Sequence, residues 1–168
     1  MQTNKNVLVS VDASEASIRA LIYVAEMIGA QRQFRVHLFH VLPPIPPELL
    51  EFGGAEDPEK ERLLSEELKK AQSCWIDGAK KEAVPILESA KRILCNAGVA
   101  PEMVRTEFCT SIHRPDVVRD VLEAASNWDC GTIVVGRHTF PWLKEKFGHH
   151  IGEGLVRKGQ GFAIWVVE

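Results

Sequence analysis

Two short apolar runs are each followed by a residue suited to ligand chemistry. Asp12 follows the run Val7–Val11, and Gly136 follows the run Thr132–Val135. Short β-branched runs are typical of strands buried on both faces, and the carboxyl ends of parallel strands meet at one edge of a sheet. A carboxylate at that edge can accept hydrogen bonds from a ribose hydroxyl or an adenine amino group, or it can simply cap the helix that follows. The pattern therefore predicts a ligand crevice beside Asp12 and Gly136.

The segment after Gly136 has the character of an anion-binding loop. Residues 136–150 read GRHTFPWLKEKFGHH, with the basic residues Arg137, Lys144 and Lys146 against one acid, Glu145. Gly148 comes just before a helical segment, and the first N–H groups of a helix attract anions. The segment therefore indicates a place for phosphate.

The elements that must position these residues alternate along the chain. The expected strands are Val7–Val11, Val36–Leu42, Val104–Cys109, Thr132–Val135 and Phe162–Val167. The expected helices run from Ser14 to Gly29, Asp57 to Asn96, Pro115 to Ala125 and about His150 to Lys158. Gly78 and Pro85 predict that the second of these is either one long kinked helix or two in succession. This alternation predicts a single α/β domain over residues 1–168, with a mainly parallel, doubly wound sheet and helices on both faces.

Several enzyme and binding classes lack their sequence signals. The turn VDASEAS has no GxGxxG fingerprint, and no GxxxxGK[ST] motif occurs. Aspartyl-phosphate enzymes usually carry a second acid two residues after the first, a position that Ser14 occupies here. No Ser-His-Asp, HExxH or paired-carboxylate pattern can be assembled, so we expect no catalytic residue and, at most, weak nucleotide hydrolysis.

The composition limits the kinds of binding partner and the cellular compartment that the sequence predicts. The formal net charge is −3, so no global field favours nucleic acid or an anionic membrane. The apolar runs are too short to span a bilayer, and the start MQTNKN has no apolar signal region, which predicts a cytoplasmic protein. The cysteines are scattered and suit packing in a reducing compartment, so no metal site is predicted. They are Cys74, Cys95, Cys109 and Cys130.

The ordered set of these segments resembles the universal stress protein family over nearly the whole chain. The matching pieces are VLVSVDASEAS, VHLFHVLPP, RPDVVRDVLEAA, DCGTIVVGRH and GLVRKGQGFAIWVV. The resemblance implies a five-stranded, Rossmann-like sheet in the order 3-2-1-4-5. It also implies a homodimer formed through the last strand, Phe162–Val167, and in some members a bound ATP.

The resemblance assigns ligand roles position by position. It implies that Asp12 and the main chain of Val41 face the adenosine, and that Gly136 and Gly148 are the first and last glycines of the G-x2-G-x9-G-[ST] phosphate loop. Thr139 stands where the second glycine belongs, and His149 stands where the Ser or Thr belongs. The interval between Thr139 and Gly148 is also one residue short of the family spacing.

These departures predict a loop whose backbone path differs from that of ATP-binding relatives. Threonine is stiff where glycine would permit close approach to phosphate, and Pro141 restricts Phe140. Arg137 and His149 offer partial compensation by charge. We therefore expect ATP or AMP to bind weakly and with little discrimination between them, with Mg²⁺ accompanying the nucleotide at most.

Three functions remain open on the sequence. The first is a dimeric regulatory protein that binds an adenine nucleotide. The second is a dimeric interaction protein on the same fold, without nucleotide and with an unknown protein partner at the Trp142 segment. The third is an enzyme that uses the nucleotide. Phe140 and Trp142 are expected to fold over the sheet edge, and His40 is expected to be a hydrogen-bonded structural residue.

Overall fold

The structure is a computed structural model, and it describes residues 4–29, 31, 33–50, 54, 56–109, 116–140 and 150–168. Its strands are β1 (Asn6–Ser10), β2 (Arg35–Val41), β3 (Val104–Cys109), β4 (Thr132–Gly136) and β5 (Ala163–Val167). Its helices are α1 (Glu15–Ile28), α2 (Pro58–Asn96), α3 (Val117–Asn127) and α5 (Ile151–Lys158), with short 3₁₀ turns at Pro47–Leu49 and Pro101–Met103. Each strand and helix lies within two residues of the range expected from the sequence.

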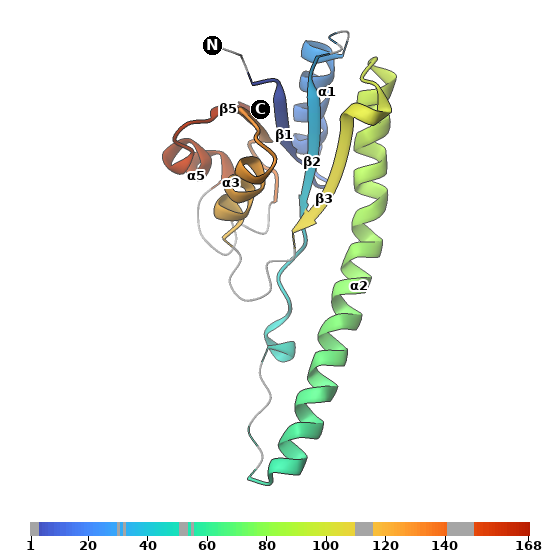
Figure 1. Cartoon of the computed structure of the whole chain (residues 1–168), viewed down its shortest axis with the longest axis vertical. Helices are drawn as coiled ribbons and strands as arrows, with labels where there is room; N and C mark the ends of the chain where they lie inside the picture. The colour runs from blue at the N-terminus through green and yellow to red at the C-terminus, as the bar shows by residue number, and fades with distance from the viewer. Residues whose placement is uncertain are drawn as a thin grey trace.

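The five strands form one sheet in the order β3-β2-β1-β4-β5, and every neighbouring pair is parallel. This confirms the predicted topology, with β1 in the middle (Figure 1). Leu8 and Val9 on this central strand have no exposed surface, which explains why both of its faces are apolar.

Two hydrophobic layers flank the sheet. Val7, Val9 and Val11 point into the layer under α1 and α2, together with Leu21 and Leu87. The opposite layer lies under α3 and α5, and its members include Leu8, Phe39, Val121, Ile133 and Leu155. The odd and even positions of β1 therefore face different helices, as the period of two along a strand requires.

Helix α1 begins where the sequence predicts. The Ser14 side chain accepts a hydrogen bond from the Ser17 N–H, and Glu15 lies in the first turn at the positive end of the helix dipole. Gly29 follows the last helical residue. A Cβ on Gly29 would lie 2.3 Å from the Ala97 carbonyl oxygen, so a glycine is needed where α1 meets the end of α2.

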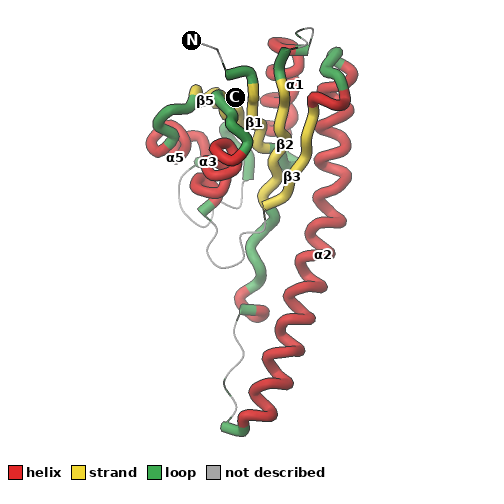
Figure 2. The backbone as a smooth tube through the Cα atoms, viewed as in Figure 1, coloured by secondary structure: helices red, strands yellow, loops and turns green. Residues whose placement is uncertain are grey.

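Helix α2 is one continuous helix of 39 residues that runs through Gly78 and Pro85. Asp57 caps its N-terminus by accepting a hydrogen bond from the Glu59 N–H. The first buried residue of α2 is Ala83. The preceding residues, 58–82, extend beyond the carboxyl edge of the sheet as an arm (Figure 2).

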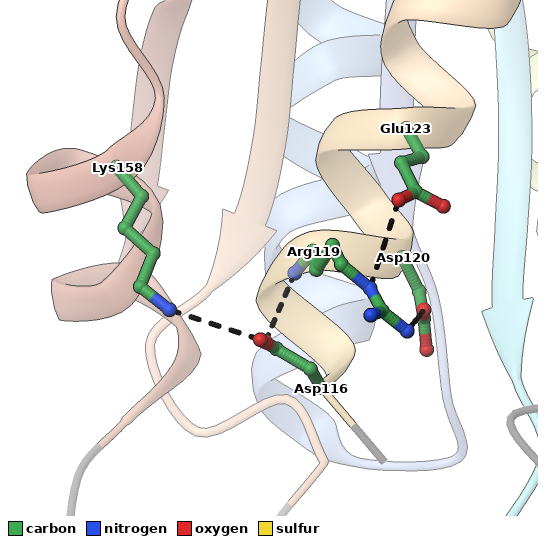
Figure 3. A network of polar contacts seen from close by, with 5 residues as sticks. All are labelled: Asp116, Arg119, Asp120, Glu123 and Lys158. Atoms are coloured by element: carbon green, nitrogen blue, oxygen red, sulfur yellow. Dashed lines mark hydrogen bonds and ion pairs between the residues drawn. The ribbon is translucent and has the colours of Figure 1, made fainter. Parts of the chain in front are cut away.

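A small polar network lies at the start of α3 and reaches α5. Asp116 accepts a hydrogen bond from the Arg119 N–H, which caps α3, and its carboxylate lies 3.8 Å from Lys158 Nζ on α5 (Figure 3). Arg119 also approaches Asp120 and Glu123 at 3.7 and 3.6 Å. Of these contacts, the Asp116–Lys158 pair joins α5 to the start of α3, and the others lie within α3 and its cap.

Candidate functional site

The parallel sheet brings the predicted ligand residues to one edge. Val9 pairs with both Leu38 and Val134, so the ends of β1, β2 and β4 lie side by side. Asp12, Val41 and Gly136 stand at or just beyond those three ends. The three residues therefore meet at one edge of the sheet, as their positions after expected strands predicted.

The Asp12 carboxylate ties the loop after β1 to the loop after β4. Its Oδ1 accepts hydrogen bonds from the Ser14 N–H at 2.9 Å and from the Ser14 hydroxyl. Its Oδ2 accepts from the Phe140 N–H at 2.6 Å. Hydrogen bonds to an ionised carboxylate are among the stronger ones in proteins. Asp12 is thus both a member of the crevice and a structural tie between loops 128 residues apart.

The chain leaves β4 through a tight turn. The Thr139 N–H donates to the Gly136 carbonyl oxygen at 3.0 Å. A Cβ on Gly136 would lie 2.3 Å from the Ala16 carbonyl oxygen, so the end of β4 packs directly against the first turn of α1. Phe140 then adopts a φ of +56°, which is uncommon for a residue with a side chain.

Phe140 turns inward beneath the sheet edge. It is 1% exposed and belongs to the layer under α3 and α5. Its ring centroid lies 6.2 Å from that of His40. Phe140 therefore covers this part of the edge, as predicted, by entering the core. Trp142, for which the same role was predicted, lies outside the described residues.

The other residues predicted to lie near the phosphates differ in burial and contacts. Arg137 is exposed, its N–H donates to the Val167 carbonyl oxygen at 2.8 Å, and its guanidinium pairs with the Glu168 carboxylate. Thr139 is buried, and its hydroxyl has no hydrogen-bond partner among the described residues. Gly148 and His149, together with Lys144 and Lys146, lie outside the described residues. The Arg137 contact could not be predicted from the sequence, because that contact depends on β5 lying beside β4.

His40 supports the site from the next strand. Its Nδ1 lies 2.7 Å from the Val11 carbonyl oxygen. A carbonyl oxygen can only accept, so Nδ1 carries the proton and the neutral ring is held in one tautomer. Burial lowers the pKa of His40, and this outweighs the opposing effects of the Val11 hydrogen bond and the Asp12 charge. The expectation of a hydrogen-bonded structural histidine is confirmed.

A second buried histidine, His37, has its pKa lowered by burial and by the nearby Arg105 and Arg35. Both rings are therefore neutral in the folded protein at pH values where an unfolded histidine begins to charge. We predict that the free energy of unfolding has its full value above about pH 6.5 and falls as the pH drops below that value. The fall is expected because histidines of the unfolded chain take up protons at a higher pH than the two buried rings do. Urea denaturation between about pH 7.5 and 5.5 checks this. The double variant His37→Gln/His40→Gln should flatten the dependence, and an unchanged slope would contradict it.

Two cavities open near these residues. One of about 290 Å³ lies between α1 and α2 beside Asp12, with walls that include Ile18, Leu21, Ile86 and Ser89. The other, of about 430 Å³, lies beside α5 and β5. Its lining includes Arg137, His150, Glu153, Arg157 and Val166. Sequence reasoning missed both, because each depends on how two distant elements pack.

His138, in the turn after β4, lies beside His150, at the start of α5, without a metal cluster in the described part of the chain. The rings of His138 and His150 lie edge to face with centroids 4.7 Å apart. Across the described ranges, no group of three or more His, Cys, Asp or Glu side chains is placed to hold a metal ion. The described helices also include none that is long and apolar enough to cross a membrane.

Comparison with known proteins decides the family. The universal stress protein family model matches residues 3–159. The chain belongs to the universal stress protein family. A search of curated proteins gave no match.

Solved structures of universal stress proteins share the fold. A family member from Burkholderia pseudomallei superposes with a TM-score of 0.65 at 19% identity, covering 99% of this chain and 98% of the other. A protein from Archaeoglobus fulgidus in complex with dAMP gives 0.54 at 17% identity, covering both chains completely. One from Arabidopsis thaliana with AMP bound gives 0.59 at 15% identity, covering 97% and 90%. At these identities the likeness establishes the fold.

Proposed function

We propose that this universal stress protein is a regulatory protein that binds an adenine nucleotide, ATP or AMP, at the carboxyl edge of its sheet. The observation that carries the proposal is the half-buried Asp12 carboxylate beside the β4 turn, at the point where the strand order reverses. Relatives of the same fold bind dAMP and AMP. Occupancy of this edge would change the surface that the protein presents to its partners.

The adenosine half of the nucleotide is assigned to Asp12 and the main chain of Val41. An ionised carboxylate offers about four acceptor positions. Three of them are used by Ser14 and Phe140, which leaves Asp12 able to accept one hydrogen bond from a ribose hydroxyl or an adenine amino group.

The phosphate half is assigned to Gly136, Arg137, Thr139, Gly148 and His149. Arg137 and His149 bring charge to a loop that departs from the family motif, whereas the Thr139 hydroxyl is buried in the structure. We therefore expect ATP and AMP to bind with similar, weak affinity, with Mg²⁺ accompanying the nucleotide if any metal does. We assign no catalytic residue.

A second candidate function is an interaction protein that binds no nucleotide. The observation in its favour is Phe140, which fills the layer beneath the edge while its N–H occupies the Asp12 carboxylate. In this case Asp12 serves only as the tie between two loops. Calorimetry with AMP and ATP on the wild type and on Asp12→Ala distinguishes the candidates.

We also propose that the chain forms a homodimer through its last strand, and the reason is the exposed edge of the sheet. β5 is an edge of the sheet, and Val166 is 39% exposed. The rings of Trp165 and Tyr23 pack edge to face, with their centroids 5.9 Å apart, so aromatic rings lie beside that edge. An exposed apolar edge strand invites pairing with a second chain.

We predict that Val166→Lys, or Ile164→Lys, abolishes pairing through β5 at micromolar concentration because a charge would be buried in the shared sheet. Sedimentation velocity measures the change. Val84→Lys, on the exposed surface of α2, is the matched control because Val84 is 40% exposed. Association that is identical in the wild type and in both edge variants, each folded by circular dichroism, would refute the β5 interface.

A further inference from the structure

The arm of α2, residues 58–82, carries an apolar stripe that one chain only half covers. Leu64, Leu68, Ala71 and Trp75 are all half-buried, although no residue of α2 before Ala83 is buried. The arm is about 37 Å long at 1.5 Å per residue. It passes the carboxyl edge of the sheet, away from the two hydrophobic layers (Figure 1).

The spacing of the stripe is that of a coiled-coil seam. Alternating steps of four and three residues connect Leu64, Leu68, Ala71, Trp75 and Gly78, and the next step reaches the charged Glu82, which ends the apolar stripe. In heptad notation Leu64, Ala71 and Gly78 are d positions, whereas Leu68, Trp75 and Glu82 are a positions. The stripe departs from the face that α2 buries against the sheet, which is formed by Ala83, Leu87, Ala90 and Leu94.

We propose that the arm pairs with the arm of a second copy of this chain, antiparallel and centred near residue 73. In an antiparallel pair, each a position meets a d position of the other helix. The large side chains then meet small ones: Trp75 faces Ala71, and Leu68 faces Gly78. Among the residues that the structure describes, a Cβ at Gly78 would have no atom within 4 Å, which leaves open space for an incoming leucine.

The flanking charges fit the same register. Antiparallel pairing brings g positions together, and at this centre Glu67 of each chain meets Lys81 of the other, twice by symmetry. Glu67, Cys74 and Lys81 are all exposed in the single chain. The two Cys74 side chains meet next to the symmetry axis.

A parallel pair would fit poorly. In register, it would set Trp75 against Trp75 and Gly78 against Gly78, so that one layer is crowded and the other empty. It would also leave Glu67 opposite the uncharged Gln72. Size and charge therefore both select the antiparallel arrangement.

The described 3₁₀ turn before α2 contacts one side of the seam. Gln72 Nε2 donates to the Leu49 carbonyl oxygen at 2.6 Å, so the 3₁₀ turn Pro47–Leu49 lies on the e-position side of the seam. The g-position side, with Glu67 and Lys81, faces solvent. The second copy occupies that side, and the contact is independent of both the nucleotide and the β5 edge.

Cys74 provides a local reporter for this contact. A short bis-maleimide, added to the full-length protein at micromolar concentration, should link two chains through their exposed Cys74 thiols. The dimer band should disappear in Cys74→Ser, which retains the other three cysteines. Absence of a Cys74-dependent dimer in the wild type would overturn the proposal.

A charge swap tests the register. Glu67→Lys and Lys81→Glu should each weaken arm pairing about tenfold or more, because each turns two attractive pairs into repulsive ones. The double variant Glu67→Lys/Lys81→Glu should restore cross-linking to within about threefold of wild type. Glu66→Lys is the matched control, since Glu66 pairs with Arg62 on the far side of the helix.

Circular dichroism confirms that each variant is folded, and sedimentation in the Val166→Lys background separates arm pairing from β5 pairing. Equal cross-linking of Glu67→Lys and Glu66→Lys would overturn the proposal. So would a double variant no better than the single ones.

Discussion

Replacing Phe140 by alanine is expected to lower the free energy of unfolding by about 3–5 kcal/mol, the usual cost of truncating a buried phenylalanine. Phe140 is 1% exposed and packs among side chains from β1, β2, α3 and α5. Alanine keeps the N–H that donates to Asp12, so the loss reports the ring alone. Urea denaturation monitored by circular dichroism measures it.

The control for this variant is Val156→Ala, because Val156 is 65% exposed. An exposed truncation should change the free energy of unfolding by no more than about 0.5 kcal/mol. If Phe140→Ala behaved like Val156→Ala, the ring could not be part of the core, and the account of the β4 loop would be wrong.

Replacing Gly136 by alanine is expected to destabilise the protein by about 3 kcal/mol, the upper end of the usual cost of overpacking. The new Cβ would lie 2.3 Å from the Ala16 carbonyl oxygen and 2.8 Å from Thr139 Oγ1. The first of these atoms is backbone, so β4 and α1 must move apart. The displacement would also disturb the Asp12–Phe140 tie, because both residues lie in the loops concerned.

Gly78→Ala is the matched control, with the opposite sign. Gly78 lies within α2, and an added Cβ there would have no atom of the described ranges within 4 Å. Alanine is favoured over glycine in a helix interior by about 1 kcal/mol, so this variant should be more stable than wild type. Chemical denaturation of both variants, at a concentration where the chain is monomeric, makes the comparison. Equal effects of the two substitutions would contradict the packing described for β4.

The sequence predicted the fold because its local signals agree with one another. The central strand Val7–Val11 is apolar on both faces, and Ser14 and Gly29 mark the ends of α1. Strand order followed from the resemblance to the family rather than from any local pattern. The continuity of α2 was left open, because Gly78 and Pro85 weaken a helix locally while packing from Ala83 onward supports it.

The site was less predictable because its key contacts join residues far apart in sequence. The N–H of the inward-turned Phe140 donates to the Asp12 carboxylate, 128 positions away. The pairing of Arg137 with Glu168 depends on β5 lying beside β4. The sequence placed Asp12, Val41 and Gly136 at the ends of expected strands, but it could not show how many of Asp12's acceptor positions the protein itself would occupy.

The most direct test of the proposed function is titration calorimetry of AMP and ATP against the wild type and Asp12→Ala. The proposal predicts measurable binding of both nucleotides to the wild type, with affinities less than a hundredfold apart, about 2.7 kcal/mol. Asp12→Ala should lose about tenfold or more, since a hydrogen bond to a charged group contributes about 1.5–3 kcal/mol. Circular dichroism must show that this variant is folded, because it also loses the tie to Phe140. Wild-type protein that binds neither nucleotide, or folded Asp12→Ala that binds both as well as wild type, would contradict a nucleotide site at Asp12.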